Sequence, residues 1–232
     1  MQVQNKESIR DHLQQDFGLT FHLWWIEQCL AYLTSKGLTN ALYDHVRAYA
    51  IKADFNGIVA AGCLPSNTHC CMSEQAFAFT NHREEAILQI VDIVDQSKSA
   101  QSQLYHIDDM TSGRDMGELD DAASDLPAGS QREPSKPNTW RPFNASKRML
   151  TLTLSDGLHV VTGFEFVRLP AFSADLALGV KVKLKAGAIL GVGMLFLTPE
   201  YVQLLQSDVP IRQTSLAKTR YRLERSLGCF LL

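Results

Sequence analysis

The chain has 232 residues, of which 45% are hydrophobic and 20% charged, and its net charge at pH 7 is −3. These values predict a globular protein of one large domain or two small ones, and they exclude collagen-like, disulfide-rich and wholly disordered chains. The near balance of 22 basic and 25 acidic residues also argues against a general nucleic-acid coat protein.

Two further features concern the cellular environment. The longest uncharged apolar run, residues 186–199, is too short to cross a bilayer. The N-terminus lacks an apolar signal core, and the five cysteines are an odd number, which fits reduced thiols better than a disulfide framework. We therefore expect an intracellular protein that does not act at a membrane.

The first 82 residues are predicted to form three short helices. Three segments carry apolar residues at helical spacing: 9–17, 21–36 and 40–53. Short amphipathic helices of this kind pack against one another, which predicts a three-helix bundle as an N-terminal domain of residues 1–82. Residues 57–82 contain several Gly, Pro, Ser and Asn residues, and we expect irregular structure or one short helix there.

Residues 86–95, with the sequence AILQIVDIVD, allow two interpretations. Polar residues at every third position favour a helix, whereas the Ile and Val content favours a strand. A long strand with a bulge would reconcile the two patterns, because a bulge reverses the alternation of faces midway. Periodicity alone does not decide between them.

Residues 96–145 form a long polar tract, which we term the insertion. Its acidic and proline-rich composition predicts that it buries too little apolar surface to fold alone. A tract of this length inside a compact protein is either functional or disordered. Trp140 and Phe143 lie near its end, and large apolar side chains in a polar loop are natural anchors for a partner.

From Arg148 the hydrophobic period changes to two, which is typical of strands. Asp156-Gly157 predicts a tight hairpin after the first of these strands, and Gly163 predicts a bulge in the return strand. About five strands between residues 83 and 207 favour a barrel, because closure removes exposed edges. Residues 208–232 are predicted to end the chain as a helix that packs on the barrel, giving an α+β fold overall.

Three lysines alternate with apolar residues in one predicted strand. Lys181, Lys183 and Lys185 are expected to face outward, where they could contact phosphates. A solvated strand face is the favoured interpretation, since no aromatic pair interleaves with them as a stacking platform for single-stranded DNA. Residues 146–232 nevertheless carry 11 basic and 6 acidic groups, a net of +5.

Motifs for catalysis and for metal binding are absent from the sequence. It contains no HExxH, P-loop, GxSxG or dinucleotide-binding glycine pattern. Cysteines and histidines between residues 63 and 82 lack the paired CxxC spacing of zinc sites. We therefore expect no enzyme activity, no cofactor or metal, and no small-molecule substrate.

Several stretches resemble the N-terminal part of the RecQ-mediated genome instability protein 1 family. They are LTFHLWWIEQCLAYL, ILQIVDIVDQSKSAQSQL, SKRMLTLTLSDG, GFEF and LGVGMLFLTPEYVQLL. The resemblance implies a three-helix bundle followed by a five-stranded OB-fold barrel, with the insertion after the first barrel strand. It also implies that residues 86–95 are that strand.

The resemblance further implies a function. Family members are non-catalytic nuclear subunits that bind topoisomerase III, a type IA enzyme, beside a RecQ helicase. Their insertion influences the topoisomerase gate during decatenation and during dissolution of double Holliday junctions. The topoisomerase-binding residues that we expect in this chain are Trp140, Arg141, Pro142, Phe143, Lys147, Arg148, Leu150, Asp156 and Gly157. Of these, the aromatic residues would supply apolar burial and the basic residues polar pairing, whereas Leu150, Asp156 and Gly157 would set the strand and hairpin behind them.

Two departures and two alternatives accompany the resemblance. Gln206-Ser207 stand where family members often have two glycines, and the chain ends at Leu232 without a second OB domain, so we do not expect the partner of that second domain. An adaptor like the N-terminus of tudor-domain-containing protein 3 is one alternative, although its insertion is generally shorter. The other is an OB-fold that binds single-stranded DNA through Lys181, Lys183 and Lys185.

Overall fold

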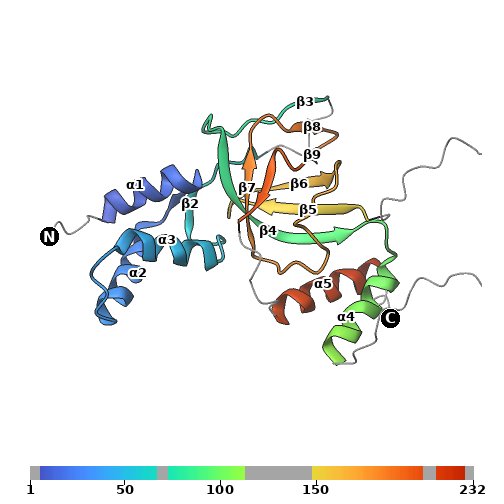
Figure 1. Cartoon of the computed structure of the whole chain (residues 1–232), viewed down its shortest axis with the longest axis horizontal. Helices are drawn as coiled ribbons and strands as arrows, with labels where there is room; N and C mark the ends of the chain where they lie inside the picture. The colour runs from blue at the N-terminus through green and yellow to red at the C-terminus, as the bar shows by residue number, and fades with distance from the viewer. Residues whose placement is uncertain (1–5, 67–72, 113–147, 206–212, 228–232) are drawn as a thin grey trace, which may run out of the picture. The chain divides into compact units, whose positions relative to one another are not determined.

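The structure is a computed structural model, and it describes residues 6–66, 73–112, 148–205 and 213–227. The chain splits into two compact units (Figure 1). The first unit comprises residues 1–96 and 149–217, and the second comprises residues 97–148 and 218–232.

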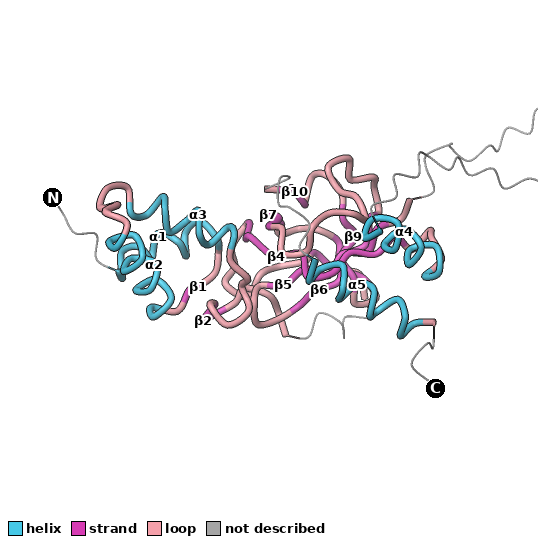
Figure 2. Tube along the Cα trace, turned by 90° about the horizontal axis from the view of Figure 1, so that it is seen from below, coloured by secondary structure: helices cyan, strands magenta, loops and turns pink. Residues whose placement is uncertain are grey.

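Helices lie at all three segments that the N-terminal spacing predicts: α1 (Lys6–Phe17), α2 (Leu23–Ser35) and α3 (Leu42–Lys52). α1 and α3 bury apolar residues at the predicted spacing, whereas α2 buries Trp25 and Leu33 but leaves Tyr32 of the same predicted face 52% exposed. Figure 2 shows the three helices side by side. Asp16 of α1 accepts hydrogen bonds from Tyr43 and Arg47 of α3, the latter at 2.9 Å. Their apolar residues join one continuous core with those of the strands.

The large sheet contains eight strands in the described residues, in the order β10-β7-β4-β5-β6-β9-β8-β3. Their bounds are β3 (Gln75–Ala76), β4 (Glu85–Asp95), β5 (Leu150–Ser155), β6 (Val160–Glu165), β7 (Lys181–Lys185), β8 (Ile189–Gly191), β9 (Met194–Leu197) and β10 (Val202–Leu204). Neighbours pair antiparallel except β6 and β9, which are parallel. The expectation of about five strands therefore differs from the structure, because segments of two to four residues are too short to show periodicity.

Residues 57–82 also differ from expectation. They contain β2 (Val59–Ala61), which pairs with β1 (Thr20–Phe21), and β3, which pairs with β8 at the edge of the large sheet. The large sheet consequently begins before residue 83, where the sequence analysis placed the domain boundary. Gln75 and Ala76 are exposed, so no apolar pattern marked this strand.

The ambiguous segment is strand β4, and it contains the bulge that would reconcile its two patterns. The register with β5 shifts between Ile90 and Asp92, which leaves Val91 as the extra residue. All five residues from Ala86 to Ile90 are buried, because α1 contacts β4 in addition to its strand neighbours. Burial on both faces gives a continuous apolar run, and such a run shows no alternation.

The second unit contains α4 (Ala100–Ser112) and the C-terminal part of α5 (Gln213–Ser226). Leu104 and Ile107 of α4 form a small core with Leu223 of α5. The terminal helix agrees with the sequence prediction, and its packing on the barrel stays a prediction. Helix α4 corrects the expectation that the insertion buries too little apolar surface to fold. None of the described helices has the length and apolar content that spanning a membrane requires.

Candidate protein-binding site at the root of the insertion

The insertion leaves the sheet after β4 and returns at the start of β5. These strands pair antiparallel, with Asp95 opposite Leu150. One residue further, the Gln96 N–H donates to the Met149 carbonyl at 2.8 Å, so the ladder continues into the connection. The two ends of the insertion therefore lie side by side, where β4 ends and β5 begins. We term this place, formed by Asp95, Gln96, Met149 and Leu150, the root.

Two buried carboxylates organise the root. Asp95 is 2% exposed, and its Oδ1 accepts a hydrogen bond from the Met149 N–H at 3.1 Å. Glu165, at the end of β6, accepts from the Leu150 N–H at 3.1 Å and from the Leu169 N–H at 2.8 Å. Hydrogen bonds to a charged acceptor are stronger than neutral ones, so these contacts fix the backbone where the insertion returns.

Large apolar side chains are exposed beside the root. Met149, Phe166 and Val167 are 42%, 64% and 46% exposed. The N–H groups of Phe166 and Val167 both donate to the Leu197 carbonyl, and the Phe166 ring stacks on Phe196 at a centroid distance of 5.5 Å. Met149 directly precedes β5, and Phe166 and Val167 directly follow β6, which pairs with β5 up to Thr151 opposite Phe164.

We term Met149, Phe166, Val167 and Phe196 the root patch. The half-exposed residues that continue this outer face along β5, β6 and β9 are all uncharged: Thr151, Thr153, Thr162, Phe164 and Met194. Large apolar side chains that stay exposed next to one another are typical of a protein-binding site. Alternation in the sequence indicates the opposite orientation, because the charged Glu165 is the residue that a strand pattern places outward. In the structure Glu165 is buried at 7% exposure, since its carboxylate accepts the two backbone hydrogen bonds described above, and the phenylalanines on either side of it lie on the outer face.

Most of the predicted topoisomerase-binding residues in the insertion lie outside the described residues: Trp140, Arg141, Pro142, Phe143 and Lys147. Arg148 is half-buried next to Met149. Leu150 is fully buried in the main core, so it offers no surface to a partner. Its side chain points into the core, a position from which it supports the strand behind the predicted contact residues.

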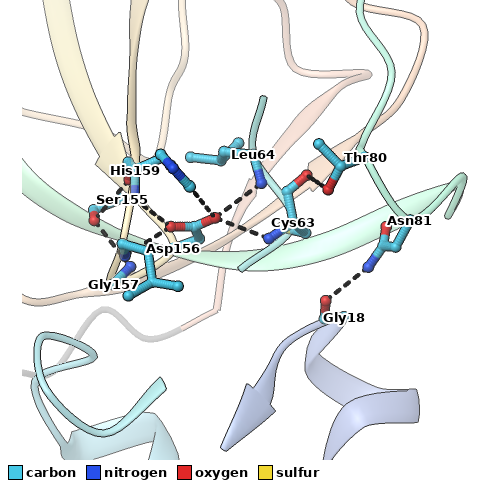
Figure 3. A network of polar contacts seen from close by, with 10 residues as sticks. Gly18, Cys63, Leu64, Thr80, Asn81, Ser155, Asp156, Gly157 and His159 are labelled. Carbon is cyan, nitrogen blue, oxygen red and sulfur yellow. Dashed lines mark hydrogen bonds and ion pairs between the residues drawn. The ribbon is translucent and has the colours of Figure 1, made fainter. Parts of the chain in front are cut away.

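Asp156 is likewise fully buried, at the turn between β5 and β6 (Figure 3). Its Oδ2 accepts hydrogen bonds from the N–H groups of Cys63 and Leu64, both at 2.8 Å. Its Oδ1 accepts from the N–H groups of Leu158 at 2.9 Å and His159 at 2.7 Å. The carboxylate thus joins the hairpin to the segment that follows β2, and it fixes the turn behind the predicted contact residues.

Two glycines make this junction possible. A Cβ on Gly62 would lie 2.1 Å from the Asp156 Oδ2, so a side chain there would displace the carboxylate. Gly157 has a φ of +97°, and its Cβ would lie 2.6 Å from the Phe55 carbonyl oxygen. Gly157 therefore serves the predicted hairpin and the contact with Phe55 rather than a partner surface.

Cys63 belongs to the same junction. Burial, and secondarily the negative charge of Asp156, raise the pKa of its thiol to about 12. A thiol with a raised pKa holds its proton at neutral pH and is a poor nucleophile or metal ligand. His69, Cys70 and Cys71 lie outside the described residues, and the described part of the chain holds no group of three potential metal ligands.

Lys181 corrects the predicted lysine stripe. It is fully buried, and its Nζ donates to the Ala53 carbonyl at 2.6 Å, the Gln89 Oε1 at 2.9 Å and the Gly179 carbonyl at 2.9 Å. The ammonium also lies 4.2 Å from the centroid of the Phe55 ring. These acceptors replace water, which is why a charged residue is tolerated inside, and Lys181 has no surface for a phosphate.

The other two lysines differ from each other. Lys183 forms an ion pair with Glu85 across the β4–β7 ladder, with 2.7 Å between Nζ and Oε1. Lys185 is exposed. The three side chains therefore do not form the continuous basic stripe that alternation predicted.

Comparison with known proteins identifies the family. Residues 64–218 match the family model described as RMI1, N-terminal OB-fold domain. RecQ-mediated genome instability protein 1 from Mus musculus is 32% identical over 122 residues, which cover 53% of this chain and 18% of that protein. The Gallus gallus protein of the same name is 34% identical over 89 residues, covering 38% of this chain and 14% of the relative.

The chain spans less than a fifth of the length of these curated relatives. The family match begins at Leu64, whose N–H binds Asp156, and it includes every strand of the large sheet, both ends of the insertion and the root patch. Because the match covers more than half of the chain, this protein belongs to the RMI1 N-terminal OB-fold domain family.

Proposed function

We propose that this protein is a non-catalytic subunit of a RecQ helicase–topoisomerase III complex. It binds the type IA topoisomerase through the root patch and the insertion, and it modulates opening and closing of the topoisomerase gate. In this role it promotes decatenation and double Holliday junction dissolution in the nucleus, and thereby genome stability. Family membership over residues 64–218 is the observation that carries the proposal.

The geometry of the root supports a modulating role. Asp95 and Glu165 both accept hydrogen bonds from the chain where the insertion returns, at Met149 and Leu150, so this end of the insertion is fixed to the sheet. A segment that binds one gate state more tightly than the other shifts the gate equilibrium by that difference in affinity. The curated relatives are named for RecQ-mediated genome instability, which agrees with a partner in this pathway.

Replacing Phe166 with Ser tests the binding surface. Truncating an exposed aromatic anchor at the centre of an interface typically costs 1 kcal/mol or more, so we expect the affinity for topoisomerase III to fall about tenfold. Leu158→Ser is the matched control, because Leu158 is 52% exposed at the opposite end of the β5–β6 hairpin. Calorimetry measures both variants, and unchanged affinity in Phe166→Ser would exclude the root patch from the interface.

Replacing residues 113–138 with a short Gly/Ser linker tests the gating role. This change retains α4, the root and Trp140, so we expect the unfolding free energy of the sheet to be retained while stimulation of decatenation is lost. Trp140→Ala is expected to weaken the complex without changing stability. Full stimulation by the shortened chain in a reconstituted decatenation assay would refute gating, and a failure of the intact chain to bind topoisomerase III would refute the proposal as a whole.

Direct binding of single-stranded DNA is the second candidate function, and the net charge of +5 in residues 146–232 favours it. Of the three lysines in the predicted stripe, Lys185 is the one left to test, because Lys181 is buried and Lys183 is paired with Glu85. If the β7 face binds phosphates, Lys185→Glu reduces both the affinity for a single-stranded oligonucleotide and the salt dependence of binding. If the affinity of Lys185→Glu and that of the original protein depend on salt concentration to the same degree, the β7 face does not bind phosphates.

A further inference from the structure

The core of the second unit joins two segments that are distant in the sequence. Leu104 and Ile107 come from the insertion helix α4, and Leu223 comes from the C-terminal helix α5. The three side chains are 8%, 6% and 4% exposed, and Ala100 packs beside them. The apolar face of α4 is therefore covered by α5.

An ion pair fixes how the two helices meet. The Arg220 Nη1 donates to the Asp108 Oδ1 at 2.6 Å, across 112 sequence positions, and the Arg220 Nε donates to Glu224 at 2.8 Å. The side chains of Arg220 and Asp108 are 45% and 48% exposed, so water screens this pair and its contribution to stability is small. The apolar contacts of Leu104 and Ile107 with Leu223 therefore supply most of the energy, and the ion pair is an additional contact between the same two helices.

The sequence of α4 explains why it needs a partner. It has 13 residues, a length at which isolated helices are marginal in water. Its sequence, AQSQLYHIDDMTS, is rich in Ser, Asp, His and Thr, which are weak helix formers. Its helical state therefore depends on burial of Leu104 and Ile107 against α5.

We propose that α5 is a positioning element for the insertion. By covering Leu104 and Ile107 it holds the first part of the insertion, residues 100–112, in a helix. The mutual stabilisation of α4 and α5 is independent of the proposed function. The expected effect of losing it on decatenation rests on the proposed function.

Hydrogen exchange of the full chain tests the coupling without any partner. Leu223→Ala removes the α5 side of the small core, and we expect amides of residues 100–112 to exchange at least about tenfold faster. Arg225→Ala, an exposed change in the same helix, is expected to leave them unchanged. In the reverse direction, Leu104→Ala is expected to speed exchange in residues 218–226, while Tyr105→Ala, at a residue that is 63% exposed, does not.

Amides of β4 and β5 serve as the internal reference, because they report whether the sheet remains folded. Equal exchange of α4 in Leu223→Ala and the unchanged chain would overturn the proposal. Faster exchange of α4 with unchanged exchange in the sheet supports it.

The decatenation assay tests the consequence. We expect Leu223→Ala to stimulate topoisomerase III as poorly as the chain shortened at residues 113–138, and Arg225→Ala to stimulate it fully. Full stimulation by Leu223→Ala alongside a defective shortened chain would overturn the positioning role. If the intact chain itself fails to stimulate, the proposed function fails, and the exchange data still decide the coupling.

Discussion

At the residue scale, buried charged groups with several hydrogen-bond partners join distant segments of this protein. Asp156 binds four backbone N–H groups from two segments, and Lys181 donates to oxygens that follow α3, lie in β4 and precede β7. A buried charge is costly unless it is paired or fully hydrogen-bonded, and both groups meet this condition. Their role is to hold the N-terminal segments against the sheet.

Asp156→Asn is expected to lower the free energy of unfolding by about 2–4 kcal/mol. An Asn has one acceptor oxygen and an NH₂ group, so two of the four backbone N–H donors would lose their acceptor in a buried site. Asp11→Asn, at a side chain 63% exposed, is the control and should change stability by less than about 0.5 kcal/mol. Urea unfolding measures both, and equal midpoints would contradict the structural role of Asp156.

Cys63 predicts a specific loss of stability in alkali. Its pKa is about 12 in the folded chain against an ordinary value of 9.0, so above pH 9 unfolding releases a proton. The stabilisation by the protonated Cys63 thiol is complete below pH 9 and is lost as the pH rises toward 12. Over this range the free energy of unfolding falls by at most about 1.4 kcal/mol per pH unit on account of this group. Urea unfolding at a series of alkaline pH values should show a shallower decline in Cys63→Ala, and parallel profiles would contradict the assignment.

At the element scale, the parallel pairing of β6 with β9 depends on Gly163. The sequence predicted a bulge there, but the β5–β6 register runs through Gly163 without a shift. A Cβ at this position would lie 2.5 Å from the Leu197 Cδ1, so the glycine admits a buried leucine of the neighbouring strand. The prediction of a bulge was wrong because close side-chain packing, rather than an extra residue, requires the glycine.

Gly163→Ala is accordingly expected to destabilise the protein by about 1–3 kcal/mol through overpacking. The neighbouring residue supplies the control, since Thr162 is half-exposed on the outer face and Thr162→Ala should cost less than about 1 kcal/mol. Thermal unfolding compares the two variants. A Gly163→Ala protein as stable as the original would show that Leu197 repacks freely.

At the scale of the whole molecule, the chain consists of two units with unequal cores. The first has a continuous core shared by α1–α3 and the sheet, whereas the described core of the second consists of Leu104, Ile107 and Leu223. Regions with few buried apolar contacts open at lower free energy than the global transition. Local opening of the second unit should therefore precede unfolding of the sheet.

This difference predicts two tiers of hydrogen exchange in the unmodified chain. Amides of α4 and of residues 218–226 should exchange by local opening, whereas those of β4 and β5 should exchange only with global unfolding. Adding urea below the unfolding transition distinguishes the two, because global opening accelerates with denaturant and local opening barely does. If the amides of both units responded to urea in the same way, the two units would not open separately, and this prediction would be contradicted.

Local patterns in the sequence were sufficient for several elements. Ile9, Leu13 and Phe17 predicted the face that α1 buries, and Asp156-Gly157 predicted the turn between β5 and β6. The possible bulge in residues 86–95 was also anticipated. Each of these features depends on neighbours within a few positions, where periodicity and turn chemistry apply.

What the sequence by itself determined is the order of helices and main strands, the place of the insertion and the family. Only the tertiary structure decided that Lys181 is inside, that Leu150 and Asp156 offer no surface, and that Phe166 does. It also decided that α4 is covered by α5. The physical reason is that strand alternation defines two faces without saying which is buried; that depends on acceptors such as Gln89 and Ala53 and on packing partners distant in the sequence.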